Sequence, residues 1–140
     1  MEIVSKREFN YPINKLWSAW TNPGHLKNWW GPNGFTNTFH EFDFTVGGRW
    51  RFTMHGPEKG NYENEVAFKV IDFEKRIEWD RITQPYFYVT VLFEKIGDER
   101  TLVTFLMKFY ERKVYDTLIK FAPEKNEENF DKLESELLRM

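Results

Sequence analysis

Three histidines, His25, His40 and His55, are the side chains of this sequence most suited to proton transfer, because imidazole changes charge near neutral pH. Only His40 is expected among aromatic residues on one face of a sheet. There it could act as an acid or a base, or orient a ligand in an apolar pocket. The alternative is a core histidine whose hydrogen bonds are satisfied within the protein.

No other group of residues in the sequence indicates catalysis. The chain has no cysteine, which excludes disulfides, thiolate nucleophiles and cysteine-bound metals. It has no Gly-x-Ser-x-Gly nucleophile elbow, and the segment Gly56–Gly60 lacks the Lys-Ser/Thr ending of a phosphate-binding loop. The histidines and carboxylates do not follow metal-ligand spacing. We therefore expect no catalytic residue, no metal and no cofactor, and favour a role other than that of an enzyme.

Arg81 is the cation whose position suggests ligand recognition. It shares a strand face with Trp79, so its guanidinium could stand beside an apolar pocket and bind a carboxylate or phosphate. The alternative is a surface arginine at an edge of the sheet. Asp43, by contrast, is expected to form an outward ion pair with Arg51, worth well under about 1 kcal/mol when exposed.

Composition and charge narrow the class of protein. With 140 residues the chain fits one domain, residues 1–140, that can bury a core without disulfides. A net charge of −2 argues against nucleic acid as a partner. No apolar run approaches the length of a membrane span or a signal peptide, so we expect a soluble cytoplasmic domain. The aromatic content of 19% indicates either a tightly packed core or an apolar pocket.

The elements that must position these side chains follow from periodicity. Alternation over Glu2–Phe9 predicts a strand, Pro12 opens a helix, and Asn22-Pro23 starts a second short helix that Gly31-Pro32 ends. Short apolar runs between glycine-containing turns then predict an antiparallel meander. The sixth and seventh strands of the chain are partly apolar on both faces, so alternation does not show which face is buried. The predicted strands of the meander are Thr36–Phe44, Arg49–His55, Tyr62–Phe73, Ile77–Ile82, Tyr86–Ile96 and Thr101–Tyr110.

A long amphipathic helix is predicted toward the C-terminus. Asn126 is a favourable N-cap, and Phe130, Leu133 and Leu137 follow on one helical face. A shorter helix is expected within Arg112–Phe121. A curved antiparallel sheet has one apolar face that must be covered, and only the last helix is long and apolar enough to cover it. The predicted fold class is α+β, with about six or seven strands wrapped around that helix.

The first glycine hairpin decides which side chains face the helix. A loop of Val46–Gly48 places Phe44 opposite Trp50 and His40 opposite Met54, which gives one apolar face. A shorter loop would put acidic residues on that face instead, so burial favours the first register. On this basis the predicted ligand-binding cavity is lined by His40, Phe42, Phe44, Trp50, Phe52, Met54, Phe68, Trp79, Arg81, Phe130 and Leu133.

Two motifs resemble a known family. The order Ala-Trp-Thr-x-Pro-x-x-Leu-x-x-Trp-Trp-Gly-Pro-x-Gly-Phe begins at Ala19, and Asp-x-x-x-Gly-Gly-Arg-Trp-x-Phe-x-Met begins at Asp43. Both are similar to single-domain relatives of the activator of the heat-shock-protein-90 ATPase, in the START-like (SRPBCC) superfamily. The resemblance covers nearly the whole chain and implies the helix-grip fold, with two short helices after the first strand. Thr45 departs from the family, which often carries arginine there.

Residues and resemblance together allow more than one function. We favour the binding of a small hydrophobic or amphipathic molecule between the sheet and the last helix. One alternative is a cyclase- or hydrolase-like enzyme of the same superfamily that uses His40 in this cavity. The other is a chaperone-regulating protein with a chaperone partner, which the family's name implies, although fold-level analogy is weak support for function.

Overall fold

Seven strands form one antiparallel sheet in the order β1-β7-β6-β5-β4-β3-β2 in the computed structural model, which describes residues 1–140. None of the four helices has the length and apolarity needed to span a bilayer. The strands are β1 (Glu2–Phe9), β2 (Thr36–Phe42), β3 (Arg49–His55), β4 (Asn61–Asp72), β5 (Arg76–Arg81), β6 (Phe87–Gly97) and β7 (Arg100–Phe109). The helices are α1 (Ile13–Thr21), α2 (Pro23–Trp29), α3 (Arg112–Leu118) and α4 (Ala122–Arg139).

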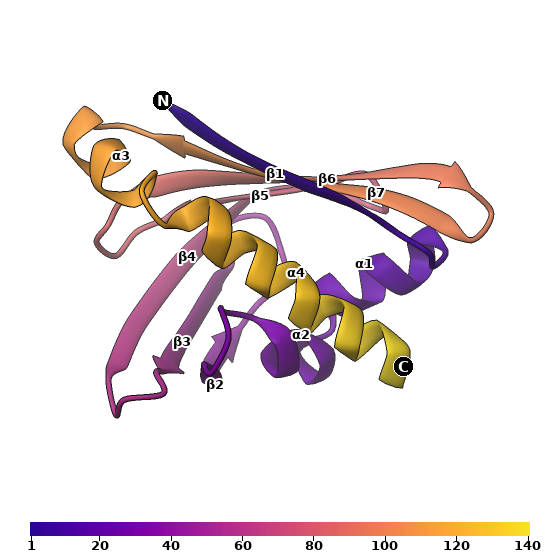
Figure 1. Ribbon diagram of the computed structural model, residues 1–140, viewed down its shortest axis with the longest axis horizontal. Coiled ribbons are helices and arrows are strands. Elements are labelled where there is room, and N and C mark those ends of the chain that lie inside the picture. The colour runs from indigo at the N-terminus through magenta and orange to yellow at the C-terminus, as the bar shows by residue number, and fades with distance from the viewer.

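The sheet curves around α4, which runs along its concave side with α1 and α2 next to it and α3 near its N-terminal end (Figure 1). Contacts of α4 with β1, α1 and α2 close the arrangement. Tryptophan, phenylalanine and aliphatic side chains from both layers fill the space between them. The predicted α+β helix-grip fold, with two short helices after the first strand, is confirmed.

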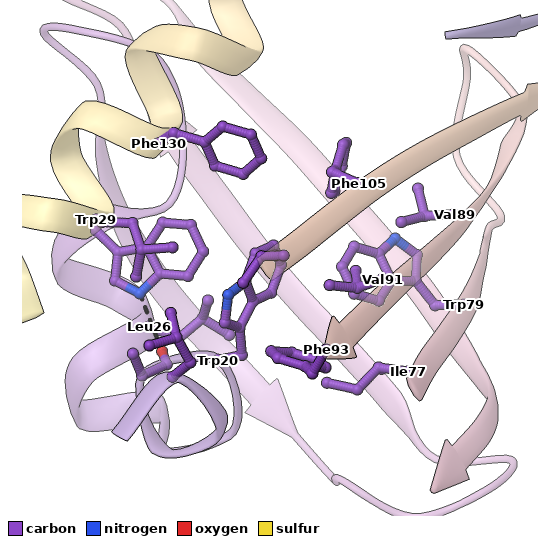
Figure 2. Packing of buried hydrophobic residues seen from close by; sticks show 14 of the residues in the cluster. Trp20, Leu26, Trp29, Ile77, Trp79, Val89, Val91, Phe93, Phe105 and Phe130 are labelled. Atoms are coloured by element: carbon purple, nitrogen blue, oxygen red, sulfur yellow. Dashed lines mark hydrogen bonds between the residues drawn. The ribbon is translucent and has the colours of Figure 1, made fainter. Parts of the chain in front are cut away.

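Local hydrogen bonds stabilise the corner between β1 and β2, which contains α1 and α2. The Asn22 side chain caps α2 by accepting a hydrogen bond from Gly24 N at 2.9 Å. The Ala19 carbonyl cannot receive the usual helical bond, because the residue one turn ahead, Pro23, has no N–H. The Trp29 indole Nε1 donates to that carbonyl instead, at 3.0 Å (Figure 2). A tryptophan therefore replaces a missing helix bond and ties α2 to α1.

α4 begins at Ala122, earlier than the predicted cap at Asn126, and that prediction was wrong. Pro123 lies in its first turn, where the missing N–H has no helical acceptor. Asn126 lies inside the helix because its amide has a partner elsewhere: Nδ2 donates to Ser5 Oγ on β1 at 3.2 Å. In the sequence, Asn126 therefore has the features of a helix N-cap, although its role is to connect α4 to β1.

Polar contacts to a buried carboxylate fasten α4 to α2. The Glu136 carboxylate, 3% exposed, accepts hydrogen bonds from His25 Nδ1 at 2.9 Å and from Asn28 Nδ2 at 3.1 Å. Arg139 Nη2 donates to it from the same helix at 2.7 Å. Burial alone would raise the pKa of this carboxyl, but the three hydrogen bonds outweigh burial and hold the pKa below its ordinary value. Lys132 Nζ donates to two carbonyls of the loop after α2, and burial lowers the pKa of Lys132.

The pairing of β2 with β3 differs from the predicted register. Phe42, and not Phe44, lies opposite Trp50, and a bulge follows Phe39. In a regular strand the rings of Phe39 and Phe42 would point to opposite faces. The extra residue at the bulge, His40, allows both rings to pack against the core. The predicted register was therefore wrong because alternation alone does not reveal a bulge.

The outer face of this hairpin also carries a different ion pair from the predicted one. Arg51 Nε donates to Glu41 Oε1 at 3.1 Å, although the sequence predicts Asp43 as its partner. Asp43 instead accepts a hydrogen bond from Thr45 Oγ1 at 2.9 Å within the turn. Because Glu41 and Arg51 are both exposed, their pair contributes well under about 1 kcal/mol.

The facing of β6, which the sequence leaves open, is fixed by its neighbours. Val89, Val91 and Phe93 are buried on the concave side. Tyr88 lies on the outer side, where its hydroxyl donates to Glu78 Oε1 at 2.7 Å. Burial and this carboxylate acceptor raise the pKa of Tyr88. The apolar residues of β6 are therefore available to line a cavity under α4.

Gly48 occupies a place in the β2–β3 turn where no side chain fits. Its carbonyl accepts a hydrogen bond from Phe68 N at 3.0 Å, and a Cβ would overlap the carbonyl oxygen of Asp43. We expect Gly48→Ala to lower the free energy of unfolding by about 2 kcal/mol, measured by urea denaturation. Gly97→Ala is the control, because its Cβ would meet only the Arg100 side chain at ordinary contact distance. Equal losses in both variants would contradict this account.

Candidate functional site

A cavity of about 170 Å³ lies between the concave face of the sheet and α4. Strands β3 to β7 supply one side of it, and the loop after α2 together with α4 supplies the other. Most of the lining is apolar. The lining residues are Trp30, Gly31, Pro32, Trp50, Phe52, Met54, Asn64, Val66, Trp79, Arg81, Phe87, Val89, Phe105, Met107, Asn126 and Asn129.

Trp30 joins the corner to the sheet at this cavity. Its ring centroid lies 5.2 Å from that of Trp50 and 5.8 Å from that of Trp79, in edge-to-face contact. Such ring pairs stabilise by about 0.5–1.5 kcal/mol beyond their buried area. Figure 2 shows the adjoining core, where Trp20 stands between the helices and the sheet residue Phe105. The cavity wall is therefore continuous with the core and shares its rigidity.

Three asparagine amides are the uncharged polar side chains of the cavity wall. Asn129 Nδ2 donates to the Trp29 carbonyl at 2.8 Å, and Asn126 is held by Ser5 as described above. Asn64 is 5% exposed, and its Nδ2 donates to a backbone carbonyl of its own strand at 2.9 Å. Because these amides are engaged with the protein, they hold the walls in place and leave little hydrogen-bonding capacity for a ligand.

Arg81 is the one charged residue on the cavity wall. Its Nε donates to the Pro85 carbonyl at 3.0 Å and its Nη2 to the Gln84 carbonyl at 3.1 Å. Its Nη1 donates to Asn64 Oδ1, and its Cζ lies 5.6 Å from the centroid of the Phe87 ring. All of these partners are uncharged. Burial without an acidic partner lowers the pKa of Arg81 to about 10.

Arg81 also lines a larger groove of about 710 Å³, which is open to solvent. The loop between β5 and β6 forms one side of this outer groove, and the segment from the end of β7 into α3 forms the other. Tyr110 Oη donates to Asp80 Oδ1 at 2.8 Å here, and burial together with this carboxylate raises the pKa of Tyr110 to about 12. Arg81 thus stands between the inner cavity and the outer groove.

A family model described as "Activator of Hsp90 ATPase homolog 1-like protein" matches residues 10–137. The chain belongs to this family. The resemblance predicted from the two sequence motifs is thereby confirmed. A search of curated proteins finds no match to the chain.

Solved structures share the fold of this AHSA1-like chain. A protein from Arthrobacter aurescens, studied by NMR in solution, has a TM-score of 0.91 and 23% identity, with 99% of this chain and 87% of that chain covered. Protein NE0264 from Nitrosomonas europaea has a TM-score of 0.89 and 20% identity, with 99% and 95% covered. The AHSA1 protein SPO3351 from Silicibacter pomeroyi has a TM-score of 0.78 and 17% identity, with 99% and 98% covered. These likenesses describe the fold alone.

The AHSA1-like chain divides the predicted site residues into three groups. The first group lines the cavity: Trp50, Phe52, Met54, Trp79 and Arg81. The second group packs in the core around the cavity without lining it: Phe42, Phe44, Phe68, Phe130 and Leu133. The third is His40, which lies away from both.

His40 lies on the outer face of the sheet and not on the concave face where the sequence predicts it. Its Nε2 is 2.7 Å from Thr53 Oγ1, which in turn donates to Glu63 Oε1 at 2.7 Å. The bulge after Phe39 is the reason, because it shifts His40 out of the alternation that places Phe39 and Phe42 inside. His40 is therefore not part of the cavity wall in this AHSA1-like chain.

Several cavity residues of this family member were missed by sequence reasoning. Phe87 and Val89 lie on β6, whose two apolar faces hide its orientation. From the sequence, Asn126 is expected to be a helix cap and Asn64 an exposed strand residue. Both lie in the cavity wall. Trp30 was also missed, although it belongs to the tryptophan-containing motif that begins at Ala19.

Proposed function

We propose that this domain binds a small apolar or amphipathic molecule in the cavity between the sheet and α4. The observation that carries the proposal is a cavity of about 170 Å³ with tryptophan and phenylalanine walls and one cationic side chain. Ligand pockets are characteristically apolar with a small number of placed polar groups. Here Arg81 is the polar group available to a ligand, and the three amides hold the walls in place.

The size of the cavity limits the part of a ligand that can enter. An engineered protein cavity of roughly 150 Å³ lined by aliphatic and aromatic side chains binds benzene. The present cavity is similar, so it suits one ring or a short branched chain. The outer groove of about 710 Å³, which shares Arg81 with it, offers room for the remainder of a longer molecule.

The alternatives have less support than ligand binding. The enzyme hypothesis relied on His40 as an acid or base in the cavity, and that side chain is on the opposite face of the sheet. The family's description names an activator of a chaperone ATPase. Stimulation of a chaperone's ATP hydrolysis by this chain would be the observation that favours such a role.

We expect benzyl alcohol to bind in the cavity and to shift the indole N–H resonances of Trp30, Trp50 and Trp79 in a ¹H–¹⁵N NMR titration. Val89→Phe places a larger side chain in the cavity wall and should weaken binding roughly tenfold or more, because the ring and the ligand compete for the same space. Val4→Phe, on the exposed outer side of β1, is the matched control and should bind as the unmodified protein does. Absence of binding, or equal binding by Val89→Phe, would refute the proposal.

A further inference from the structure

We propose that Arg81 binds a carboxylate of the ligand, so that the ligand class is a small monocarboxylate with an aromatic or branched apolar body. The inference rests on the proposed function, because it needs a molecule seated in the cavity. The carboxylate would lie where the cavity and the outer groove share Arg81, and the apolar body would lie among the rings of the inner cavity.

Arg81 differs in its surroundings from every other arginine of the chain. The others are paired with carboxylates or exposed: Arg7, Arg51, Arg76, Arg100, Arg112 and Arg139 form ion pairs, and Arg49 is exposed. Arg81 is half-buried and forms no ion pair, and the carboxylate of the adjacent Asp80 is engaged by the Tyr110 hydroxyl. A cation withdrawn from water without a counter-ion is unfavourable. A carboxylate that arrives with the ligand would supply the missing charge.

The guanidinium is already held in position for such a partner. Each guanidinium nitrogen of Arg81 donates one hydrogen bond: Nε to the Pro85 carbonyl, Nη2 to the Gln84 carbonyl and Nη1 to Asn64 Oδ1. One N–H therefore stays free on Nη1 and one on Nη2. Two N–H groups on a planar guanidinium match the two oxygens of a carboxylate. Because Asn64 is itself fixed by its bond to the Tyr62 carbonyl, Arg81 loses little further freedom when a ligand binds.

Charge balance favours a carboxylate over a phosphate monoester. The outer groove beside Arg81 carries the carboxylates of Asp80 and Glu111. The inner cavity wall carries one positive charge, and its amides are engaged within the protein. A monoanion neutralises that charge. A phosphate dianion would leave an excess negative charge and additional oxygen acceptors in an apolar enclosure, which is costly. An amine would repel the guanidinium, so cationic molecules are excluded.

Phenylacetate, phenylacetamide and phenyl phosphate separate these cases, because they share one ring and differ in the head group. We expect phenylacetate to bind at pH 7 roughly tenfold or more tightly than phenylacetamide, since its hydrogen bonds to Arg81 are charge-assisted. Phenyl phosphate should bind more weakly than phenylacetate. Dissociation constants come from NMR titration of the tryptophan indole resonances.

Variants of Arg81 identify the group responsible. Arg81→Gln should weaken phenylacetate binding roughly tenfold and leave phenylacetamide within about twofold. Arg81→Lys keeps the charge and loses the two-pronged geometry, so it should lie between the two. Arg76→Gln is the matched control, because Arg76 lies on the same strand and pairs with Glu78 at 3.3 Å. Should Arg81→Gln fail to fold, Arg81→Lys gives the same comparison.

The outcomes distinguish the two proposals. If phenylacetate and phenylacetamide bind equally and Val89→Phe abolishes both, the cavity binds ligands and the carboxylate inference is wrong. If phenyl phosphate binds more tightly than phenylacetate, the ligand class is a phosphate ester and the inference is again wrong. If none of the three binds, the proposed function fails and the inference with it.

Discussion

Replacement of Trp50 by alanine should lower the free energy of unfolding by about 3–5 kcal/mol, the largest single loss expected in this protein. The Trp50 side chain is 1% exposed, and its ring lies 4.3 Å from Phe52 and 5.2 Å from Trp30, centroid to centroid. Removal of the indole leaves a void that its rigid neighbours cannot fill. Since domains are stable by only about 5–15 kcal/mol, the midpoint of guanidinium denaturation should fall markedly.

Two phenylalanine variants show whether ring packing or the indole N–H is responsible. The buried Trp50 Nε1 has no hydrogen-bond partner, whereas Trp29 Nε1 donates to the Ala19 carbonyl. Trp50→Phe should therefore cost less than Trp29→Phe, which leaves that carbonyl without a donor, by about 1–2 kcal/mol. A larger loss in Trp50→Phe than in Trp29→Phe would contradict this assignment.

Glu136→Ala should lower the free energy of unfolding by about 2–3 kcal/mol at pH 7, because the buried carboxylate accepts three hydrogen bonds that the alanine variant loses. The loss also detaches α4 from His25 and Asn28 of α2. Glu134→Ala is the control on the same helix: its side chain is 50% exposed and pairs with Arg7 at 3.3 Å. That pair should contribute well under about 1 kcal/mol. Comparable losses in the two variants would refute the role given to Glu136.

The same carboxyl should make stability depend on pH in the acidic range. Its folded-state pKa lies below the ordinary value of 4.5, so the unfolded chain takes up the proton first as the pH falls. The stabilisation is complete above pH 4.5 and is lost as the pH falls through the lower, folded-state pKa. Glu136→Gln removes the ionisable group, so its unfolding free energy should fall less steeply below that value than that of the unmodified protein. Parallel pH profiles for the two would exclude this contribution.

Much of the fold could be predicted from the sequence because its signals are local. Pro12 and Asn22-Pro23 mark helix starts whatever the tertiary context, and alternation over Glu2–Phe9 describes a strand with one buried face. The long apolar stripe of the last helix had to be buried, and the apolar face of the curved sheet was the surface that could bury it. These features predicted the layers and the order of elements.

The full set of cavity residues could not be predicted, because it depends on a bulge and on long-range contacts that local sequence patterns do not show. A bulge at His40 exchanges faces within β2, and no residue type in the segment requires it. Asn126 satisfies its amide through Ser5, a residue far away in the sequence, so a cap and an interior contact are indistinguishable beforehand. Arg81 was the exception. It shares a strand face with Trp79, and regular pairing with β4 from Trp79 to Arg81 keeps both side chains at the cavity.

The position of α4 in the chain affects how the domain can assemble. The helix follows all seven strands, yet it contacts β1, α1 and α2, which lie near the other end of the sequence. During synthesis all seven strands therefore leave the ribosome before α4, and the part of the concave face that α4 covers is open to water until this helix docks. Docking of α4 encloses the cavity and ends that exposure in one step. A small molecule that fills the cavity would favour the docked state by mass action, so ligand supply and the yield of folded protein become coupled.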